Sequence, residues 1–250
     1  MLRLNDISFS YDGNEFINNL NIDINHKKFI SIIGPNGSGK STLIKILTNN
    51  IKDYKGDIFY FKKNIKKYTV KEFSKITSYI GQKNNIKFPY TALELVLMGR
   101  TPHKTLFESY SKEDFEICKK YMQMTDCYEF CDRLITNLSG GEYQRVLFAR
   151  SLVQRTKILF LDESFSAMDI SYKIKCFKLL KKLIKEEDLS VISIMHDINF
   201  AYKYSDEILL MKDGQIYKFG DTKNIMNEEN INYVFNTNLN FYEDKGFFLN

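Results

Sequence analysis

The pattern of apolar and polar residues predicts strands in the first part of the chain. Apolar residues fall close to alternate positions from residue 2 to residue 9, and they alternate strictly from residue 20 to residue 24, after the turn sequence Tyr11-Asp12-Gly13. Alternation with a period of two is typical of strands that bury one face. These two segments together predict a small antiparallel sheet.

Short and almost wholly apolar runs indicate a second kind of strand, buried on both faces. The clearest run is Phe29 to Ile33, which leads through glycine-rich sequence into a helical pattern from Leu43 to Leu47. Further strands are predicted at residues 57–61, 76–80, 157–161, 190–195, 207–211 and 215–219, with a hairpin turn at Asp213-Gly214. Since helices separate most of these strands, we expect a parallel sheet with helices on its faces.

Helical patterns dominate two other regions. Residues 92–152 read as an inserted helical subdomain, and a short helical pattern follows Asp221. A last apolar segment lies around Phe241 and Phe247, and composition does not indicate its function. The chain of 250 residues, 44% hydrophobic and 27% charged, suits a single large α/β domain.

Composition and charge restrict the classes of function. The four cysteines lack paired spacing, which disfavours a structural zinc site and suits a reducing compartment. The net charge of +5 comes from dispersed basic residues, so a solvated surface is favoured over nucleic-acid binding. We find no secretory signal and no apolar run near the roughly 20 residues that a membrane-spanning helix needs. We therefore expect a cytosolic chain whose membrane role, if any, comes through partners.

A candidate phosphate-binding loop follows the strand predicted at residues 29–33. Residues 34–41 match G-x-x-x-x-G-K-[ST] between a buried strand and an amphipathic helix, the context that this motif requires. Glycines let successive N–H groups converge on phosphate oxygens at a positive helix start. Lys40 is expected to neutralise the β- and γ-phosphates of ATP or GTP, and the Ser41 hydroxyl to ligate Mg²⁺. The expected nucleotide contacts are Gly34, Pro35, Asn36, Gly37, Ser38, Gly39, Lys40, Ser41 and Thr42.

Two adjacent acids follow the apolar run at residues 158–161. Asp162 is expected to hold Mg²⁺ directly or through water, and Glu163 to polarise the water that attacks the γ-phosphate. Taken alone, the pair could equally cap the next helix. Beside the phosphate loop, we interpret it as catalytic.

The segment Leu138-Ser139-Gly140-Gly141-Glu142-Tyr143-Gln144-Arg145 resembles the signature sequence of ABC ATPases. In physical terms it is a second anion-binding helix start, with a serine hydroxyl and two glycines that permit close approach. An ordinary helix cap is the alternative, which the position shortly before the acid pair disfavours. In this family the phosphate belongs to ATP on a second subunit. The resemblance therefore implies an ATP-sandwiched homodimer with nucleotide contacts from Ser139, Gly140, Gly141 and Glu142.

Four further residues fall in the order that this family has. Tyr11 resembles the aromatic residue that stacks on adenine, although a tyrosine after a strand is often a packing residue. Gln82 resembles the glutamine that touches Mg²⁺ or the attacking water. Asp169, in Ser166-Ala167-Met168-Asp169, resembles the loop that crosses to the partner subunit. His196 resembles the switch histidine that contacts the γ-phosphate, with an ordinary surface or capping histidine as the alternative.

Some positions depart from the family pattern. Ser164-Phe165 stands where Pro-Thr is usual, Met168 where leucine is usual, and Glu142 where glutamine is frequent. The first pair could alter the geometry of the loop that carries Glu163. We therefore expect that turnover can be slow even where ATP binding is normal.

Residues 91–103 are similar to the helical subdomain of importers for iron-siderophore complexes, haem and cobalamin. The family places this segment near the groove that receives a coupling helix of the permease. An apolar helix that ends at Gly99, with Pro102 fixing the exit, suits a docking edge, although most of its leucines are expected in the core.

The resemblance implies an ATP-binding and hydrolysing subunit that powers an ABC importer for iron-siderophore complexes, haem or cobalamin. Three alternatives to this function stay open. Soluble ABC-type ATPases in DNA repair or translation share the nucleotide motifs, but they usually carry a long coiled coil or two ATPase halves. An importer subunit for free metal ions is a second alternative. A module that has lost hydrolysis is the third, and the retained Lys40, Asp162, Glu163 and His196 argue against it.

Together, these features predict an α/β fold with a P-loop NTPase core, a mainly parallel sheet, an amino-terminal antiparallel β subdomain and an inserted helical subdomain. The expected boundaries are 1–88 and 153–220 for the core, 89–152 for the helical subdomain and 221–250 for a carboxyl-terminal extension. The expected partners are a second copy, transmembrane permease subunits and, indirectly, an extracytoplasmic substrate-binding protein, without nucleic acid. The expected location is the cytoplasmic face of the membrane, and the expected cofactors are ATP and Mg²⁺.

Overall fold

The structure is a computed structural model that describes residues 1–11, 13–81, 88–165, 168–242 and 246–249. By their internal contacts, the residues form two compact units. The first unit comprises Met1–Tyr68 and Ser190–Asn250, and the second unit comprises Thr69–Leu189. The domain boundaries inferred from the sequence stay a prediction.

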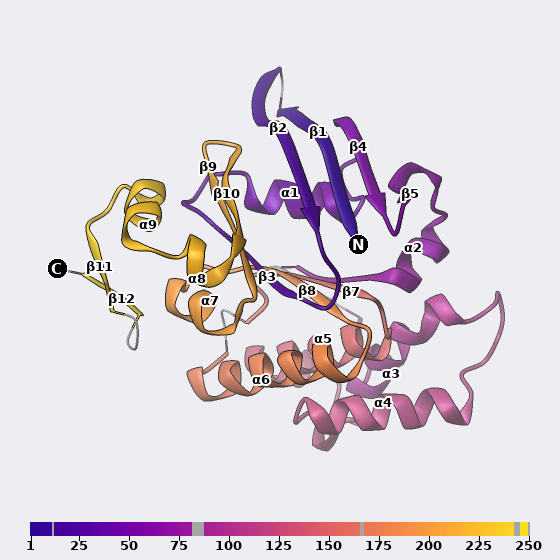
Figure 1. Cartoon of the computed structure of the whole chain (residues 1–250). Helices are drawn as coiled ribbons and strands as arrows, with labels where there is room; N and C mark the ends of the chain where they lie inside the picture. Colours follow the sequence, from indigo (N-terminus) through magenta and orange to yellow (C-terminus); the bar gives the residue numbers. More distant parts are fainter. Residues whose placement is uncertain (12, 82–87, 166–167, 243–245, 250) are drawn as a thin grey trace. The chain divides into compact units, whose positions relative to one another are not determined.

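The amino-terminal residues of the first unit form an antiparallel sheet with the order β2-β1-β4-β5 (Figure 1). Its strands are β1 (Leu2–Tyr11), β2 (Asn14–Ile24), β4 (Lys55–Tyr60) and β5 (Lys63–Asn64). Leu2, Leu4 and Ile7 of β1 are buried, which explains the apolar positions near the start of the chain. Tyr60 donates a hydrogen bond of 2.6 Å to the Leu47 carbonyl, so this sheet packs on the helix α1 (Lys40–Leu47). The predicted antiparallel sheet is confirmed.

A mainly parallel set of strands forms the rest of the core of the first unit. Its strands are β3 (Phe29–Ile33), β8 (Ser190–Ile194), β9 (Glu207–Lys212) and β10 (Gln215–Asp221). β3 lies between β8 and β9 and is parallel to both, while β10 returns antiparallel to β9. Every residue of β3 and β8 is buried. Burial on both faces is the reason that these strands appear in the sequence as continuous apolar runs.

Short elements complete the first unit. They are η1 (Ile65–Lys67), α7 (Ile198–Tyr204), α8 (Thr222–Ile225), α9 (Glu228–Phe235), β11 (Leu239–Tyr242) and β12 (Gly246–Leu249). β11 and β12 pair as a hairpin at the carboxyl-terminal end. Asn199 on α7 holds this hairpin through two hydrogen bonds with the backbone of Phe247, at 2.8 and 3.2 Å. The sequence predicted helices after Asp221, but not this hairpin.

The second unit consists of helical segments and two parallel strands. Its elements are α2 (Val70–Ile76), β6 (Thr77–Ile80), α3 (Ala92–Leu97), η2 (Met98–His103), α4 (Lys112–Met124), η3 (Tyr128–Phe130), η4 (Ile135–Asn137), α5 (Gly140–Val153), β7 (Ile158–Asp162) and α6 (Ile170–Glu186). β6 pairs parallel with β7. The mostly helical character of residues 92–152 and the α/β class are therefore confirmed.

One helix boundary differs from the expectation. The α-helix that starts after Thr91 ends at Leu97 rather than at Gly99, and the chain continues as the 3₁₀ helix η2 through Pro102. A Cβ at Gly99 would lie 2.3 Å from the Arg150 carbonyl oxygen. Gly99 is therefore required for the close approach of η2 to α5, and not as a helix cap.

Across the described ranges, none of the helices combines the length and the apolar character that crossing a membrane requires.

Candidate functional site

The phosphate loop of the first unit joins β3 to α1 and bends through glycines. Gly37 and Gly39 have φ values of 82° and 97°, in the left-handed region that favours glycine. Gly34 is fixed for a different reason, because a Cβ there would lie 2.1 Å from the Met211 carbonyl oxygen. Among the described residues, no side chain caps the start of α1. A helix start of this kind is suited to an anion.

Two side chains of the loop fit a bound phosphate. Lys40 is 6% exposed, and its Nζ donates hydrogen bonds of 2.8 Å to the carbonyl oxygens of Gly34 and Pro35. The ammonium group therefore lies folded over the loop. Ser38 is 2% exposed, and its Oγ has no hydrogen-bond partner within the described part of the chain. A buried hydroxyl without a partner is costly, and a phosphate oxygen would accept its hydrogen bond.

Tyr11 lies beside the first turn of α1. Its hydroxyl and the Thr42 Oγ1 are 3.4 Å apart, and its ring makes edge contacts with Phe9 and Phe16. Tyr11 as a whole remains 44% exposed. It can therefore offer a face to a flat ligand near the phosphate loop, as adenine stacking requires.

His196 lies at the same edge of the first unit as the phosphate loop. It follows β8, which runs parallel to β3, and the Met195 N–H donates to the Ile32 carbonyl at 3.2 Å. The imidazole is exposed, and the adjacent Asp197 caps α7 by accepting hydrogen bonds from the N–H groups of Asn199 and Phe200. The capping role considered for His196 thus belongs to Asp197.

The predicted acid pair lies at the carboxyl end of β7 in the second unit. Asp162 is 4% exposed, and its Oδ2 accepts a hydrogen bond of 3.4 Å from the Tyr79 hydroxyl on β6. Burial raises the pKa of Tyr79 to about 12, with a further contribution from Asp162, so this hydroxyl stays a donor at neutral pH. Glu163 has a φ of 53°, which is uncommon for a residue other than glycine. Such backbone strain clusters at functional sites.

The two unusual residues after Glu163 are both buried and both anchored. The Ser164 hydroxyl donates a hydrogen bond of 2.8 Å to the Ile80 carbonyl at the end of β6. The Phe165 ring packs edge-on against Phe148 at 5.2 Å and Phe177 at 5.7 Å. The departure from Pro-Thr therefore gives this loop a hydrogen bond and an aromatic anchor.

The signature turn starts α5 with a complete capping box. The Ser139 hydroxyl accepts from the Glu142 N–H at 3.3 Å, and the Glu142 carboxylate accepts from the Ser139 N–H at 2.7 Å. These hydrogen bonds lower the pKa of Glu142. A Cβ built at Gly140 or Gly141 would meet no described atom within 4 Å, and neither glycine has a positive φ. Nothing described within this chain therefore explains why both are glycine.

Gln82 and Asp169 are the remaining residues that were expected at the nucleotide site. Gln82, Ser166 and Ala167 lie outside the described residues. Asp169 is the N-cap of α6, accepting hydrogen bonds from the Tyr172 N–H at 2.9 Å and the Ser171 hydroxyl at 2.5 Å. This cap fixes the first turn of α6.

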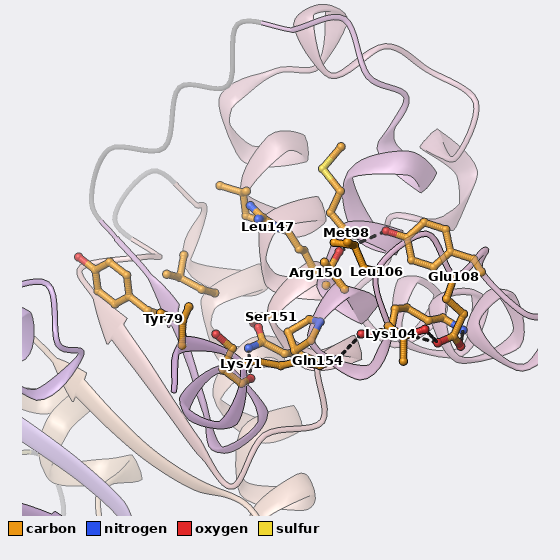
Figure 2. Close-up of a pocket in the computed structure, with 18 of the residues that line it drawn as sticks. Lys71, Tyr79, Met98, Lys104, Leu106, Glu108, Leu147, Arg150, Ser151 and Gln154 are labelled. Atoms are coloured by element: carbon orange, nitrogen blue, oxygen red, sulfur yellow. Dashed lines mark hydrogen bonds and ion pairs between the residues drawn. The ribbon is translucent and has the colours of Figure 1, made fainter. Parts of the chain in front are cut away.

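A groove of about 1080 Å³ lies within the second unit (Figure 2). The segments α2, the end of β6, η2 with the loop that follows it, and α5 line its walls. Arg150 points into this region, and burial lowers its pKa. No carboxylate in the described ranges forms an ion pair with Arg150. The groove thus combines apolar walls with a cation that an acidic group could pair with.

The loop at the rim of this groove displays apolar side chains on a fixed backbone. Leu106 is 85% exposed and Phe107 is 97% exposed. Glu108 accepts hydrogen bonds from the Thr105 N–H and hydroxyl at 2.8 and 2.9 Å, which lower its pKa to about 2. Lys104 bridges Glu108 and the buried Asp114. This loop therefore presents two adjacent apolar side chains to solvent at the rim of the groove.

Sequence reasoning missed Tyr79, Leu106, Phe107 and the anchoring role of Ser164. The Leu-Phe pair between charged residues in a loop was an available signal. The hydroxyls of Tyr79 and Ser164 gave none, because their partners depend on the pairing of β6 with β7.

Comparisons with known proteins show the family. The family described as ABC transporter matches residues 17–166. The chain is 32% identical over 250 residues to the petrobactin import ATP-binding protein FpuC of Bacillus anthracis, covering 99% of this chain and 92% of that protein. It is 31% identical to the hemin import ATP-binding protein HmuV of Escherichia coli O157:H7, covering 98% and 95%. The chain therefore belongs to the ATP-binding proteins of ABC transporters, and its enzymatic class is that of the ABC ATPases.

Relatives of other lengths and solved structures agree with this assignment. An ABC transporter ATP-binding protein of Bacillus subtilis is 34% identical over 95% of this chain, and the chain spans 54% of its length. A structure described as a metal-chelate type ABC transporter in an inward-facing conformation has a TM-score of 0.81 at 28% identity, covering 99% of this chain and 94% of that chain. The dimeric bacterial cassette MJ0796 has a TM-score of 0.78 at 28% identity, covering 89% and 99%.

Proposed function

We propose that two copies of this chain bind and hydrolyse ATP with Mg²⁺, and that the pair drives a membrane permease that imports an iron-siderophore complex or haem. The observation that supports the proposal is the presence of two glycine-rich turns at helix starts whose glycines meet different structural constraints. The phosphate loop needs its glycines to form, whereas Gly140 and Gly141 leave open space above the start of α5. A phosphate held by a second copy fits that space.

In this proposal, the phosphate loop supplies binding and the acid pair supplies hydrolysis. Lys40 and the Ser38 hydroxyl hold phosphate oxygens, and Tyr11 stacks on adenine. Asp162, Ser41 and Gln82 would hold Mg²⁺, which neutralises phosphate charge when bound. Glu163 orients and deprotonates the attacking water, and His196 contacts the γ-phosphate. Ser139, Gly140, Gly141, Glu142 and Asp169 complete the site from the second copy.

The groove of the second unit is the proposed docking surface for the permease. The groove has an apolar rim at Leu106 and Phe107, and its Arg150 has no ion-pair partner among the residues that the structure describes. Both features suit an amphipathic helix that carries an acidic side chain. Association of such a helix would place the chain at the cytoplasmic face of the membrane. An extracytoplasmic binding protein would then deliver the cargo to the permease.

The names of the relatives support the choice of cargo. One relative is named for petrobactin import and another for hemin import, and a solved structure is described as metal-chelate type. A soluble ATPase of DNA repair is the main rival. The longest helix of the described residues is α6, with 17 residues, which leaves no long coiled coil there and favours transport.

Steady-state ATP turnover and sedimentation of three forms of the chain test this proposal. Lys40→Ala should abolish ATP binding, and Glu163→Gln should reduce turnover by at least about 100-fold while trapping an ATP-bound dimer. Full turnover in a protein that stays monomeric with ATP would refute the paired mechanism.

Capture from membranes tests the docking surface separately. The tagged chain should retain a hydrophobic membrane protein, and Phe107→Ser should lose it without changing the turnover of the isolated chain. Phe115→Ser is a matched control, because Phe115 is also an exposed phenylalanine, at 43%, but lies on α4 outside the residues that line the groove. Equal capture by wild type and Phe107→Ser would argue against this surface.

A further inference from the structure

The turn that carries Glu163 is held on one side by a hydrogen bond that the family sequence pattern does not provide. Ser164 is 6% exposed, and its hydroxyl donates to the Ile80 carbonyl at 2.8 Å. Proline, the residue usual at this position, has no hydroxyl to donate. The bond therefore belongs to this chain rather than to the common sequence pattern.

The bond fixes the residue that directly follows a strained one. Glu163 has a φ of 53°, and a backbone in this region persists only when its neighbours determine it. The preceding residue, Asp162, is the last residue of β7, and the following Ser164 is tied to β6. The Ser164 hydrogen bond and the packing of the Phe165 ring thus restrain the backbone that follows Glu163, and loss of the bond would loosen this restraint.

The acceptor of this bond also belongs to the wall of the groove. Tyr79 and Ile80, the last two residues of β6, both line it, and Figure 2 shows Tyr79. The Tyr79 hydroxyl makes a second link from the same strand end, to the Asp162 carboxylate at 3.4 Å. The end of β6 thus contacts the groove on one side and the acid pair on the other.

We propose that Ser164 is a positioning residue, whose hydrogen bond to the Ile80 carbonyl holds Glu163 in place. Through the same bond, the position of Glu163 depends on whether the groove is occupied. This dependence rests on the proposed function, since it requires a permease in the groove. The positioning part concerns this chain alone. A hydrogen bond that positions a general base affects the rate of hydrolysis more than the affinity for ATP.

The test compares Ser164→Ala with Thr77→Ala. Thr77 is a matched control, because it is 7% exposed and its hydroxyl donates at 3.0 Å to the Phe73 carbonyl, at the opposite end of β6. Ser164→Ala should lower kcat about five-fold, with KM and the affinity for a fluorescent ATP analogue within two-fold of wild type. Ser164→Thr, which keeps the hydroxyl, should recover most of the rate.

Amide hydrogen exchange gives a readout that does not depend on turnover. Exchange in the peptide that contains Glu163 should be faster in Ser164→Ala and unchanged in Thr77→Ala. In a complex purified from membranes through this chain, the stimulation of ATP turnover over the free chain should fall at least about three-fold in Ser164→Ala.

Three results would overturn the inference: a kcat of Ser164→Ala within two-fold of wild type, unchanged exchange around Glu163, or equal losses in both alanine variants. If the complex stimulated the ATP turnover of Ser164→Ala as strongly as that of the wild type, the proposed link between the groove and Glu163 would be wrong. Failure of the proposed function looks different, because Lys40→Ala and Glu163→Gln would then keep wild-type turnover, whereas the exchange comparison would still report on the bond.

Discussion

Two helices of this chain begin in glycine-rich turns, α1 after the phosphate loop and α5 after Ser139. In the first turn, Gly37 and Gly39 adopt left-handed angles and a Cβ on Gly34 would collide with the Met211 carbonyl. In the second turn, Gly140 and Gly141 have neither constraint, and Ser139 already caps the helix. Glycine is therefore required by the fold of the chain in the first turn. In the second turn, we propose that it is required by the approach of a second molecule.

The largest expected effect concerns the packing that supports α5. Arg100 is buried and contacts both the Asp114 carboxylate at 3.0 Å and the Val153 carbonyl at the end of α5 at 2.8 Å. Asp114→Asn leaves Arg100 without its counter-charge, so the free energy of unfolding should fall by roughly 3 to 5 kcal/mol. Urea unfolding measures this loss. An unchanged ATP affinity in the folded variant would show that this support acts on the second unit alone.

The same carboxylate predicts an acid dependence. Burial alone would raise the pKa of Asp114, but hydrogen bonds from Lys104, Ser111 and Arg100 lower it well below its usual value. The contribution of Asp114 to stability is thus present above about pH 4, the pKa in the unfolded chain, and is lost as pH falls toward the folded-state pKa. In Asp114→Asn, that loss should be absent from the pH profile.

The next effect concerns a glycine that the fold requires. Gly34→Ala places a Cβ 2.1 Å from a backbone oxygen that cannot move away cheaply. The free energy of unfolding should fall by roughly 1 to 3 kcal/mol, and ATP binding should be lost with it. Calorimetric titration with ATP and urea unfolding measure the two together. Normal ATP affinity in this variant would contradict the assignment of the loop.

The matched change in the signature turn should affect turnover but not stability. Gly140→Ala adds a Cβ in open space, so stability should stay level or rise by up to about 1 kcal/mol. ATP affinity of the single chain should also stay level, while turnover falls at least about ten-fold because the approach of a second copy is blocked. A stable variant with full turnover would remove the distinction between the two turns.

The smallest effect concerns the capping box. Glu142→Gln keeps an acceptor for the Ser139 N–H, so stability at pH 7 should stay close to that of the wild type. Hydrogen bonds from Ser139 lower the pKa of Glu142. Its contribution is therefore present above about pH 4.3 and lost as pH falls through the folded-state pKa. The glutamine variant should show a flatter profile there, which thermal unfolding across pH measures.

The sequence predicted those parts of the fold that depend on local pattern. The runs at β3 and β8 are buried on both faces, and the alternation at β1 and β2 follows one buried face. The hairpin of β11 and β12 was not predicted, because it is fixed by Asn199, far away in the chain. Gly99 was predicted to end a helix, because a glycine after an apolar helix usually does so. In the structure, its role is to let the backbone pass close to the Arg150 carbonyl on α5.

For the candidate site, the sequence motifs identified the functional residues but not the hydrogen bonds and backbone geometry that hold them in place. The positions of Lys40 and Asp162 follow from strands that end where the motifs begin. The strain at Glu163 and the anchoring of Ser164 depend on how β6 lies beside β7. Spacing along the chain carries no information about such cross-strand hydrogen bonds.

Crosslinking between two differently tagged copies tests the central claim most directly. One copy carries Asn36→Cys in the phosphate loop and the other Asn137→Cys before the signature turn, both exposed positions, in a Cys131→Ser background. With ATP and a short bismaleimide, our account predicts crosslinked pairs that contain one copy of each kind, and none without ATP. The absence of such pairs while ATP turnover persists, or equal yields with and without ATP, would contradict it.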